Sequence, residues 1–262
     1  MIFKEIIKRG HEQISYFNDS TLGLKGIVAI HNTVLGPALG GCRMWNYSSE
    51  KDALIDVLRL SKGMTYKAAI AGLNLGGGKA VIIGDPKKEK SEELFRSFGR
   101  FIEGLGGRYI TAEDVGTSIK DMDYVRMETK YVTGISKSFG GSGDPSLLTA
   151  FGTYLGIKAS VKYRLKKNSL KGLSISVQGL GSVGMELIKY LSNDEMKIFA
   201  CDIDTETAKI TEDKYQISIV SPDKIYDQNV DIYAPCALGA TINDKTIPRL
   251  KCSIVAGAAN NV

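Results

Sequence analysis

The order of apolar and polar positions along the 262-residue chain predicts an alternation of strands and helices. In the first half, apolar and β-branched runs predict strands at residues 13–18, 21–30, 80–84 and 108–111. Apolar positions at helical spacing predict a helix that Ser49 caps and that ends near Lys67, and further helices at residues 92–105 and 119–129. The chain therefore begins with mixed α/β structure.

A glycine-rich stretch at residues 134–145 separates this half from a second alternation, which opens with a helix at 150–163. Strands are expected here at residues 173–177, 197–200, 218–220, 231–234 and 252–256. Five strands with helices between them predict a parallel, doubly wound sheet of Rossmann type. We therefore expect two α/β domains, residues 1–145 and 146–262. Because such a sheet commonly has about six strands and closing helices, we expect the second domain to be incomplete.

Composition narrows the class of protein. The chain is 43% hydrophobic and 24% charged, which is typical of a soluble globular protein. No apolar run is long enough to span a membrane, and no secretory signal opens the sequence. The four cysteines are scattered without a CxxC pair, which predicts reduced thiols, a cytoplasmic protein and no metal site.

The net charge of +5 arises largely from residues 158–171, where basic residues follow one another without an acid. Nucleic-acid binding is one interpretation of this run, but no nucleic-acid-binding motif accompanies it. We therefore interpret the run as the solvated end of a helix that precedes a strand.

A dinucleotide-binding turn follows the strand at residues 173–177. The turn reads Gly179-Leu180-Gly181-Ser182-Val183-Gly184, and apolar residues at helical spacing continue from it. The glycines permit a tight turn, close approach of a pyrophosphate and close packing of the helix, whose N-terminus attracts phosphate. The next strand ends at Asp202, an acid that suits an unphosphorylated ribose and favours NAD over NADP. Asp204 competes for this role but lies further past the strand.

The first half carries the candidate chemistry. Lys67 and Lys79 both lie in apolar, glycine-rich surroundings, where desolvation lowers the pKa of a lysine. The three glycines before Lys79 are expected to leave room for a substrate or a cofactor ring. Two carboxylates, Glu113 and Asp114, follow a short strand, so that one could transfer a proton and the other cap a helix. Both histidines precede residue 32, so a histidine base placed beyond the glycine turn is excluded.

Five motifs together carry a resemblance over nearly the whole chain. They are residues 36–43 (GPALGGCR), 63–69 (GMTYKAA), 75–80 (LGGGKA), 111–117 (TAEDVGT) and 256–261 (AGAANN). In this order they resemble the signatures of the amino acid dehydrogenase superfamily, which holds the glutamate, leucine, phenylalanine and valine enzymes. The overall pattern is most similar to the leucine enzymes.

The resemblance implies a role for individual residues. Lys79 would activate water and Asp114 would exchange a proton with the substrate amine. Lys67 and the backbone at Gly40 and Gly41 would hold the α-carboxylate, and Leu39 and Met64 would wall the side-chain pocket. The implied contacts with NAD are Gly179, Leu180, Gly181, Ser182, Val183, Gly184 and Asp202, with Thr149, Cys236, Ala237, Asn260 and Asn261 on the nicotinamide side.

The resemblance also implies a function and a partner. The expected reaction is the NAD-dependent oxidative deamination of a branched-chain aliphatic L-amino acid by a homo-oligomer assembled through the first domain. The sequence departs from the family pattern at two points. Asp144 stands where the leucine enzymes usually carry Asn, and family chains continue beyond the position of Asn261. The alternative is a shortened, catalytically impaired relative that retains nucleotide binding or subunit association. A basic, nucleic-acid-associated Rossmann protein is a more distant alternative.

Overall fold

The computed structural model describes residues 2–237 and 239–259. The chain forms two compact units, Met1–Asp144 and Pro145–Val262, and their boundary falls in the glycine-rich stretch. Each unit has its own sheet and its own hydrophobic core.

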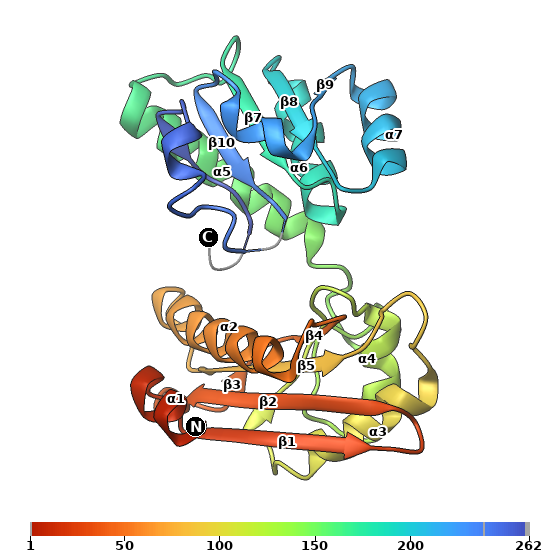
Figure 1. Cartoon of the computed structure of the whole chain (residues 1–262). Helices are drawn as coiled ribbons and strands as arrows, with labels where there is room; N and C mark the ends of the chain where they lie inside the picture. The colour runs from red at the N-terminus through yellow and green to blue at the C-terminus, as the bar shows by residue number, and fades with distance from the viewer. Residues whose placement is uncertain (1, 238, 260–262) are drawn as a thin grey trace. The chain divides into compact units, whose positions relative to one another are not determined.

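Unit 1 is built on a mixed six-stranded sheet (Figure 1). Its strands are β1 (Gln13–Asp19), β2 (Leu24–Asn32), β3 (Ala38–Leu39), β4 (Cys42–Trp45), β5 (Gly76–Ile83) and β6 (Tyr109–Ile110). The order is β1-β2-β5-β3-β6, and β4 also pairs with β5. β2 runs antiparallel to β1 and β5, whereas β3 and β4 run parallel to β5. β5 therefore lies at the centre of the sheet, and β1 forms one edge.

Helices cover both faces of this sheet. They are α1 (Ile2–Arg9), α2 (Glu50–Ile70), α3 (Glu92–Glu103) and α4 (Ile119–Arg126), with a short 3₁₀ helix, η1 (Lys137–Phe139). Val57 and Leu58 of α2 pack on one face with Val81 of β5, and α3 and α4 pack on the other face with Ala80 and Ile82 (Figure 1). This alternation follows from the two-residue period of a strand.

The glycine run before Lys79 is part of β5, which corrects the expected strand start at residue 80. Nor do these glycines leave room for a ligand. A Cβ atom on Gly77 would lie 2.1 Å from Thr65 Oγ1, and one on Gly78 would lie 2.6 Å from the ring of Tyr109. The glycines instead allow α2 and Tyr109 to approach the strand closely.

Unit 2 contains a five-stranded, fully parallel sheet, which confirms the predicted strand count (Figure 1). Its strands are β7 (Ser174–Gln178), β8 (Lys197–Cys201), β9 (Ser218–Ile219), β10 (Ile232–Pro235) and β11 (Ile254–Val255). Its helices are α5 (Ser146–Leu165), α6 (Ser182–Asn193) and α7 (Thr205–Tyr215), with 3₁₀ helices η2 (Pro222–Asp227) and η3 (Ile247–Arg249).

The strand order is β11-β10-β7-β8-β9, so the chain winds outward from β7 in both directions. The topological switch point lies between β7 and β10, and ligands of such sheets bind beyond the carboxyl ends of the strands at this point. Apolar residues of α5, α6 and α7 pack on one face, while Ile225 of η2 packs with Cys201 and Tyr233 on the other.

Other boundaries differ from the sequence expectation. The strand expected from residue 21 begins at Leu24, because residues 20–23 form the turn from β1. The helix expected from residue 150 begins at Ser146. α1, β3 and β4 were not predicted. The strands β3 and β4 are only two and four residues long, too short to show a clear period.

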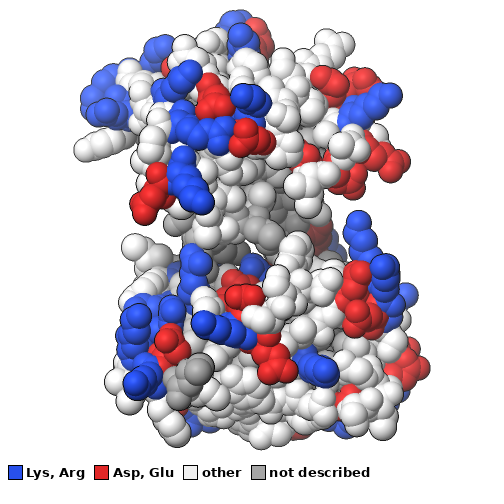
Figure 2. Space-filling model, in the orientation of Figure 1, with Lys and Arg blue, Asp and Glu red and all other residues white. Residues whose placement is uncertain are grey.

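The surface is mixed in charge. Figure 2 shows Lys and Arg side chains interspersed with Asp and Glu over the visible face. Part of the basic run is paired, since Lys171 Nζ lies 2.7 Å from the Glu195 carboxylate. Among the described residues, no helix is long and apolar enough to cross a membrane.

Candidate active site

A buried lysine lies at the centre of the unit 1 sheet. Lys79 belongs to β5, pairs with Ala29 of β2 and is only 3% exposed. It shares its strand face with Gly77 and Val81, so its side chain projects toward the layer that holds α2. A buried ammonium group requires a charged or polar partner.

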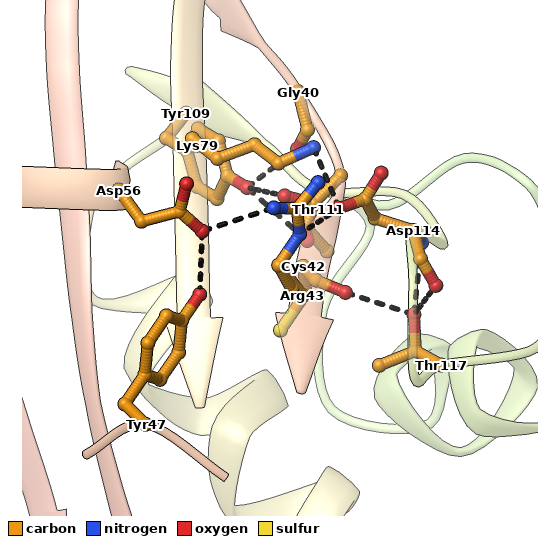
Figure 3. A network of polar contacts seen from close by, with 11 residues as sticks. Gly40, Cys42, Arg43, Tyr47, Asp56, Lys79, Tyr109, Thr111, Asp114 and Thr117 are labelled. Carbon is orange, nitrogen blue, oxygen red and sulfur yellow. Dashed lines mark hydrogen bonds and ion pairs between the residues drawn. The ribbon is translucent and has the colours of Figure 1, made fainter. Parts of the chain in front are cut away.

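Asp114 supplies that partner (Figure 3). Lys79 Nζ lies 3.1 Å from Asp114 Oδ2, and Arg43 Nε donates to the same oxygen at 2.9 Å. Thr117 Oγ1 fixes the loop after β6, because it accepts from the Asp114 N–H and donates to the Cys42 carbonyl. Since both cations contact Oδ2, Oδ1 is the carboxylate oxygen left to exchange a proton with a ligand.

The pKa values of both residues of this pair lie below their ordinary values. Burial lowers the pKa of Lys79; attraction to Asp114 opposes this, and repulsion from Arg43 adds to it. Burial would raise the pKa of Asp114, but attraction to Lys79 and Arg43 outweighs burial, so its pKa lies below the ordinary value. Asp114 is thus held ionised beside an amine that loses its proton more readily than a surface lysine.

Sequence reasoning did not single out Arg43 as a functional residue. It lies on β4, is 7% exposed, and also donates from Nη1 to Asp56 Oδ2 at 3.0 Å. Tyr47 Oη donates to the same Asp56 oxygen at 2.7 Å. The available signal was the position of Arg43 directly after the Gly40-Gly41-Cys42 turn, but nothing in the sequence indicates its burial.

The turn at Gly40 and Gly41 comes close to both charged residues. A Cβ atom on Gly40 would lie 1.8 Å from the Gly78 carbonyl oxygen, and one on Gly41 would lie 2.9 Å from Asp114 Cβ. The Gly40 N–H donates to the Ile110 carbonyl, and Tyr109 Oη donates to the Gly40 carbonyl (Figure 3). Within the part of the chain that the structure describes, the Gly41 N–H has no hydrogen-bond partner, so it is free to donate to a ligand.

Two further predicted residues lie beside this turn, and a third is exposed. Met64 of α2 has its Cγ atom 3.3 Å from the Cβ position of Gly40, and Leu39 of β3 pairs with Gly77. Lys67 lies in the last turn of α2 and is exposed. The structure therefore brings Leu39, Met64 and Gly40 together and leaves Lys67 facing solvent.

Glu113 differs from its neighbour. The expectation that one of the two acids caps a helix is wrong, because Ser118 caps α4. The Glu113 Oε2 atom is buried without a hydrogen-bond partner among the described residues and lies where a Cβ atom on Gly134 would be. Burial raises the pKa of Glu113, and repulsion from Asp144 and Asp114 adds to this rise.

In unit 2, the glycine turn follows β7 at the switch point of the sheet. Gly179 has φ +102°, a conformation that favours glycine, and a Cβ atom on Gly184 would lie 2.0 Å from the Gly179 carbonyl oxygen. Gly181 is the N-cap of α6, no side chain caps this helix, and the space around the Gly181 Cβ position is open. The exposed Ser182 opens α6, and the partly buried Val183 packs on the core.

The two candidate acids after β8 have different environments. Asp202 Oδ2 accepts from the Leu180 N–H of the glycine turn at 2.6 Å, and its Oδ1 accepts from the Asp204 N–H at 2.8 Å. Asp204 is the N-cap of α7, where its side chain accepts from the N–H groups of Glu206 and Thr207. Asp202 is therefore the acid that contacts the glycine turn.

The remaining predicted contacts of unit 2 are only partly near this turn. Cys236 and Ala237 follow β10, and the Cβ position of Gly179 lies 2.8 Å from the Ala237 nitrogen. Thr149 lies exposed in the first turn of α5. Asn260 and Asn261 lie outside the described residues.

The chain is similar in sequence to known amino acid dehydrogenases. Residues 11–131 match the family model described as Glu/Leu/Phe/Val dehydrogenase, dimerisation domain. The chain is 56% identical over 260 residues to leucine dehydrogenase of Thermoactinomyces intermedius, a match that covers 99% of this chain and 71% of that protein.

Two solved structures are also similar. L-tryptophan dehydrogenase from Nostoc punctiforme has a TM-score of 0.71 at 43% identity, covering 100% of this chain and 74% of that one. A hetero-hexameric glutamate dehydrogenase from Thermus thermophilus has a TM-score of 0.79 at 21% identity, covering 95% and 67%, and shows the fold alone.

The fold is that of a two-domain amino acid dehydrogenase. The chain belongs to the Glu/Leu/Phe/Val dehydrogenase family.

Proposed function

We propose that this protein catalyses the NAD-dependent oxidative deamination of a branched-chain aliphatic L-amino acid. The products are the 2-oxo acid, ammonia and NADH. The observation that carries this proposal is the buried contact between Lys79 and Asp114, in a chain that is 56% identical to a leucine dehydrogenase.

Unit 1 is proposed to bind and activate the amino acid. The Gly41 N–H donates to the substrate α-carboxylate, and Lys67 of α2 supplies a positive charge for it. Asp114 Oδ1 accepts a proton from the substrate ammonium group, because Oδ2 is already occupied by Lys79 and Arg43. The resulting free amine donates electrons to the α-carbon as hydride leaves it.

Lys79 then acts as the base for the second half of the reaction. In its neutral form it takes a proton from water, and the hydroxide adds to the imine carbon. Asp114 returns its proton to the carbinolamine nitrogen. The C–N bond then breaks as the C=O bond forms, and the hydroxyl proton passes to the Asp114 carboxylate, which gives ammonia and the 2-oxo acid. The lowered pKa of Lys79 makes the neutral amine available at a pH where a surface lysine is protonated.

The residues after β7 and β8 fit a dinucleotide. The uncapped N-terminus of α6 offers N–H groups to a pyrophosphate, and the open space at Gly181 lets it approach. Asp202 accepts hydrogen bonds from ribose hydroxyl groups and would repel a 2′-phosphate, which supports NAD over NADP. NAD supplies the hydride acceptor for the reaction.

The test is the initial rate of NADH formation from L-leucine, L-valine, L-isoleucine and L-phenylalanine. We expect the branched-chain substrates to give the highest kcat/KM, because Leu39 and Met64 form an apolar wall beside Gly40. A faster rate with L-phenylalanine would contradict the substrate class. Absence of NADH formation by folded protein that binds NAD would instead support the alternative of an impaired relative.

The active form is proposed to be a homo-oligomer assembled through unit 1. β1 is an edge strand, and such an edge presents unpaired N–H and C=O groups. Grooves of about 280 and 230 Å³ lie along this strand, and both are lined by Tyr16 and Phe17. An added antiparallel strand would place alternate side chains in the two grooves.

The free state of all four cysteines supports a cytoplasmic location.

A further inference from the structure

We propose that Arg43 is a positioning residue for the deamination: anchored by Asp56, it holds the Asp114 carboxylate by Oδ2 and keeps a fixed positive charge beside Lys79. This inference rests on the proposed function and adds to it a residue to which we have so far given no role in the reaction. The evidence is a continuous chain of contacts from α2 to the reacting groups (Figure 3).

Asp56 anchors Arg43. Asp56 projects from α2 and receives Arg43 Nη1 at 3.0 Å and Tyr47 Oη at 2.7 Å on the same oxygen. Arg43 is thus held at one end of its guanidinium group by a carboxylate that is itself hydrogen-bonded. Its Nε atom, at the other end, donates to Asp114 Oδ2 at 2.9 Å.

This geometry requires an arginine. Two donors of one planar group reach two carboxylates on different elements, the α2 helix and the loop after β6. Arg43 uses two different nitrogen atoms for these contacts, whereas a lysine has a single nitrogen. With Oδ2 fixed by Arg43 and Lys79, the Asp114 carboxylate cannot rotate freely, so Oδ1 is presented in one direction.

The charge of Arg43 has a second effect. Because a guanidinium group keeps its proton at every accessible pH, the charge beside Lys79 and Asp114 is permanent. It lowers the pKa of both groups, whereas the attraction between Lys79 and Asp114 raises the pKa of Lys79 and lowers that of Asp114. When a substrate binds to Asp114 and neutralises its charge, the attraction that favours a proton on Lys79 is lost. The positive charge of Arg43 then still lowers the pKa of Lys79.

The other titratable groups around this pair do not supply such a charge. Burial raises the pKa of the Cys42 thiol and of the Tyr109 phenol, so both are neutral near pH 7. Glu113 and Asp56 are acidic and would shift Lys79 in the opposite direction. Arg43 is therefore the group whose removal should raise the pKa of Lys79.

The experiment compares Arg43→Gln, Arg43→Lys and Asp56→Asn with the wild-type protein in two measurements. One is the pH profile of kcat and kcat/KM with L-leucine. The other is the titration of the Lys79 side chain by NMR on protein labelled at the lysine ε-carbon, which needs no turnover. Arg59→Gln removes the same charge from an exposed position of α2 and is the matched control.

We expect Arg43→Gln to lower kcat by about a hundredfold, the scale of a misplaced reacting group. Its acid limb and the Lys79 titration should both move to higher pH by about one unit or more. Arg43→Lys should keep the pH profile but not kcat. Asp56→Asn removes the anchor of Arg43, so it should lower kcat. Because it removes a negative charge, it should not move the Lys79 titration upward. If Arg43→Gln does not fold, Asp56→Asn tests the positioning role of Arg43.

Arg43 would have no such role if the Lys79 titration of Arg43→Gln matched that of Arg59→Gln. The same conclusion would follow if Arg43→Gln and Asp56→Asn moved it equally in one direction. If the wild-type protein forms no NADH but its Lys79 titration depends on Arg43 as expected, the proposed reaction fails while the effect of Arg43 on Lys79 stands. The two failures are therefore distinguishable.

Discussion

At the scale of residues, the site is a buried set of charges that compensate one another. An isolated buried lysine would be costly, and the contact with Asp114 offsets that cost. Arg43 and Asp56 extend the alternation of charge toward α2. The same arrangement that makes burial tolerable also perturbs the pKa values, so stability and chemistry rest on the same contacts.

A second buried polar group, His11, is expected to make the stability of the protein depend on pH. Its Nε2 atom lies 3.1 Å from the Leu58 carbonyl oxygen and 2.9 Å from Ser61 Oγ of α2. Burial, together with the nearby His31, lowers the pKa of His11 from 6.5 to about 4. Above pH 6.5 the ring is neutral in both the folded and the unfolded chain.

As the pH falls through 6.5, the unfolded chain binds a proton that the folded ring binds only near pH 4. The free energy of unfolding should therefore fall between these values, by about 3 kcal/mol from this group. His11→Gln should remove that part of the pH dependence in urea unfolding at pH 7 and pH 4. An unchanged difference between the two pH values would show that His11 does not titrate as expected.

The residue pattern singled out Lys67 and Lys79 in glycine-rich, apolar surroundings and the acids Glu113 and Asp114 after a short strand. The choice of Lys79 as base and of Asp114 over Glu113 came from the family resemblance. The sequence could not predict Arg43, since nothing in a local pattern distinguishes a buried arginine from an exposed one. Burial of Arg43 depends on the pairing of β4 with β5 and on the approach of α2, and neither is a local property.

At the scale of elements, β5 organises unit 1. Its residues alternate between the α2 layer and the α3–α4 layer, and its glycines set how closely α2 approaches. The sequence predicted the apolar part of this strand but not its first residues. Glycine disfavours strands in general, and only the close contact of Thr65 with Gly77 explains its use here.

Gly77→Ala therefore should destabilise the protein by about 3 kcal/mol, because the new methyl group would collide with Thr65 and push α2 outward. It should also raise KM for the amino acid, since α2 carries Met64 and Lys67. Gly152→Ala on α5 is the matched control, because nothing lies within 4 Å of its Cβ position. That control should stabilise the protein by about 0.5 to 1 kcal/mol in urea unfolding. Equal stability of the two variants would contradict this account of the strand.

At the scale of the whole molecule, the folds of the two units could be predicted from the sequence to different degrees. The parallel sheet and the glycine turn of unit 2 follow from strong local signals. The mixed sheet of unit 1 follows only in part, because β3 and β4 are two and four residues long and gain their place only by pairing with neighbours.

The proposed oligomer interface at β1 can be tested by substitution of an exposed residue on this strand. Tyr16 is 52% exposed on the edge strand β1 and lines both grooves. Tyr16→Lys should lower the mass measured by size-exclusion chromatography with light scattering, because a lysine on an edge opposes strand addition. Tyr163→Lys, on an exposed position of α5, should leave that mass unchanged. Equal masses for Tyr16→Lys and wild type would place the interface elsewhere.

The central claim is that the buried amine of Lys79 carries proton transfer in an NAD-dependent deamination. The most direct test is the rate of NADH formation from L-leucine by the wild-type protein and by Lys79→Met, with NAD binding measured by calorimetry on the same samples. We predict a loss of at least about a hundredfold in kcat with unchanged NAD affinity, and no loss for the exposed Lys87→Met. A Lys79→Met protein that turns over at the wild-type rate would contradict the account.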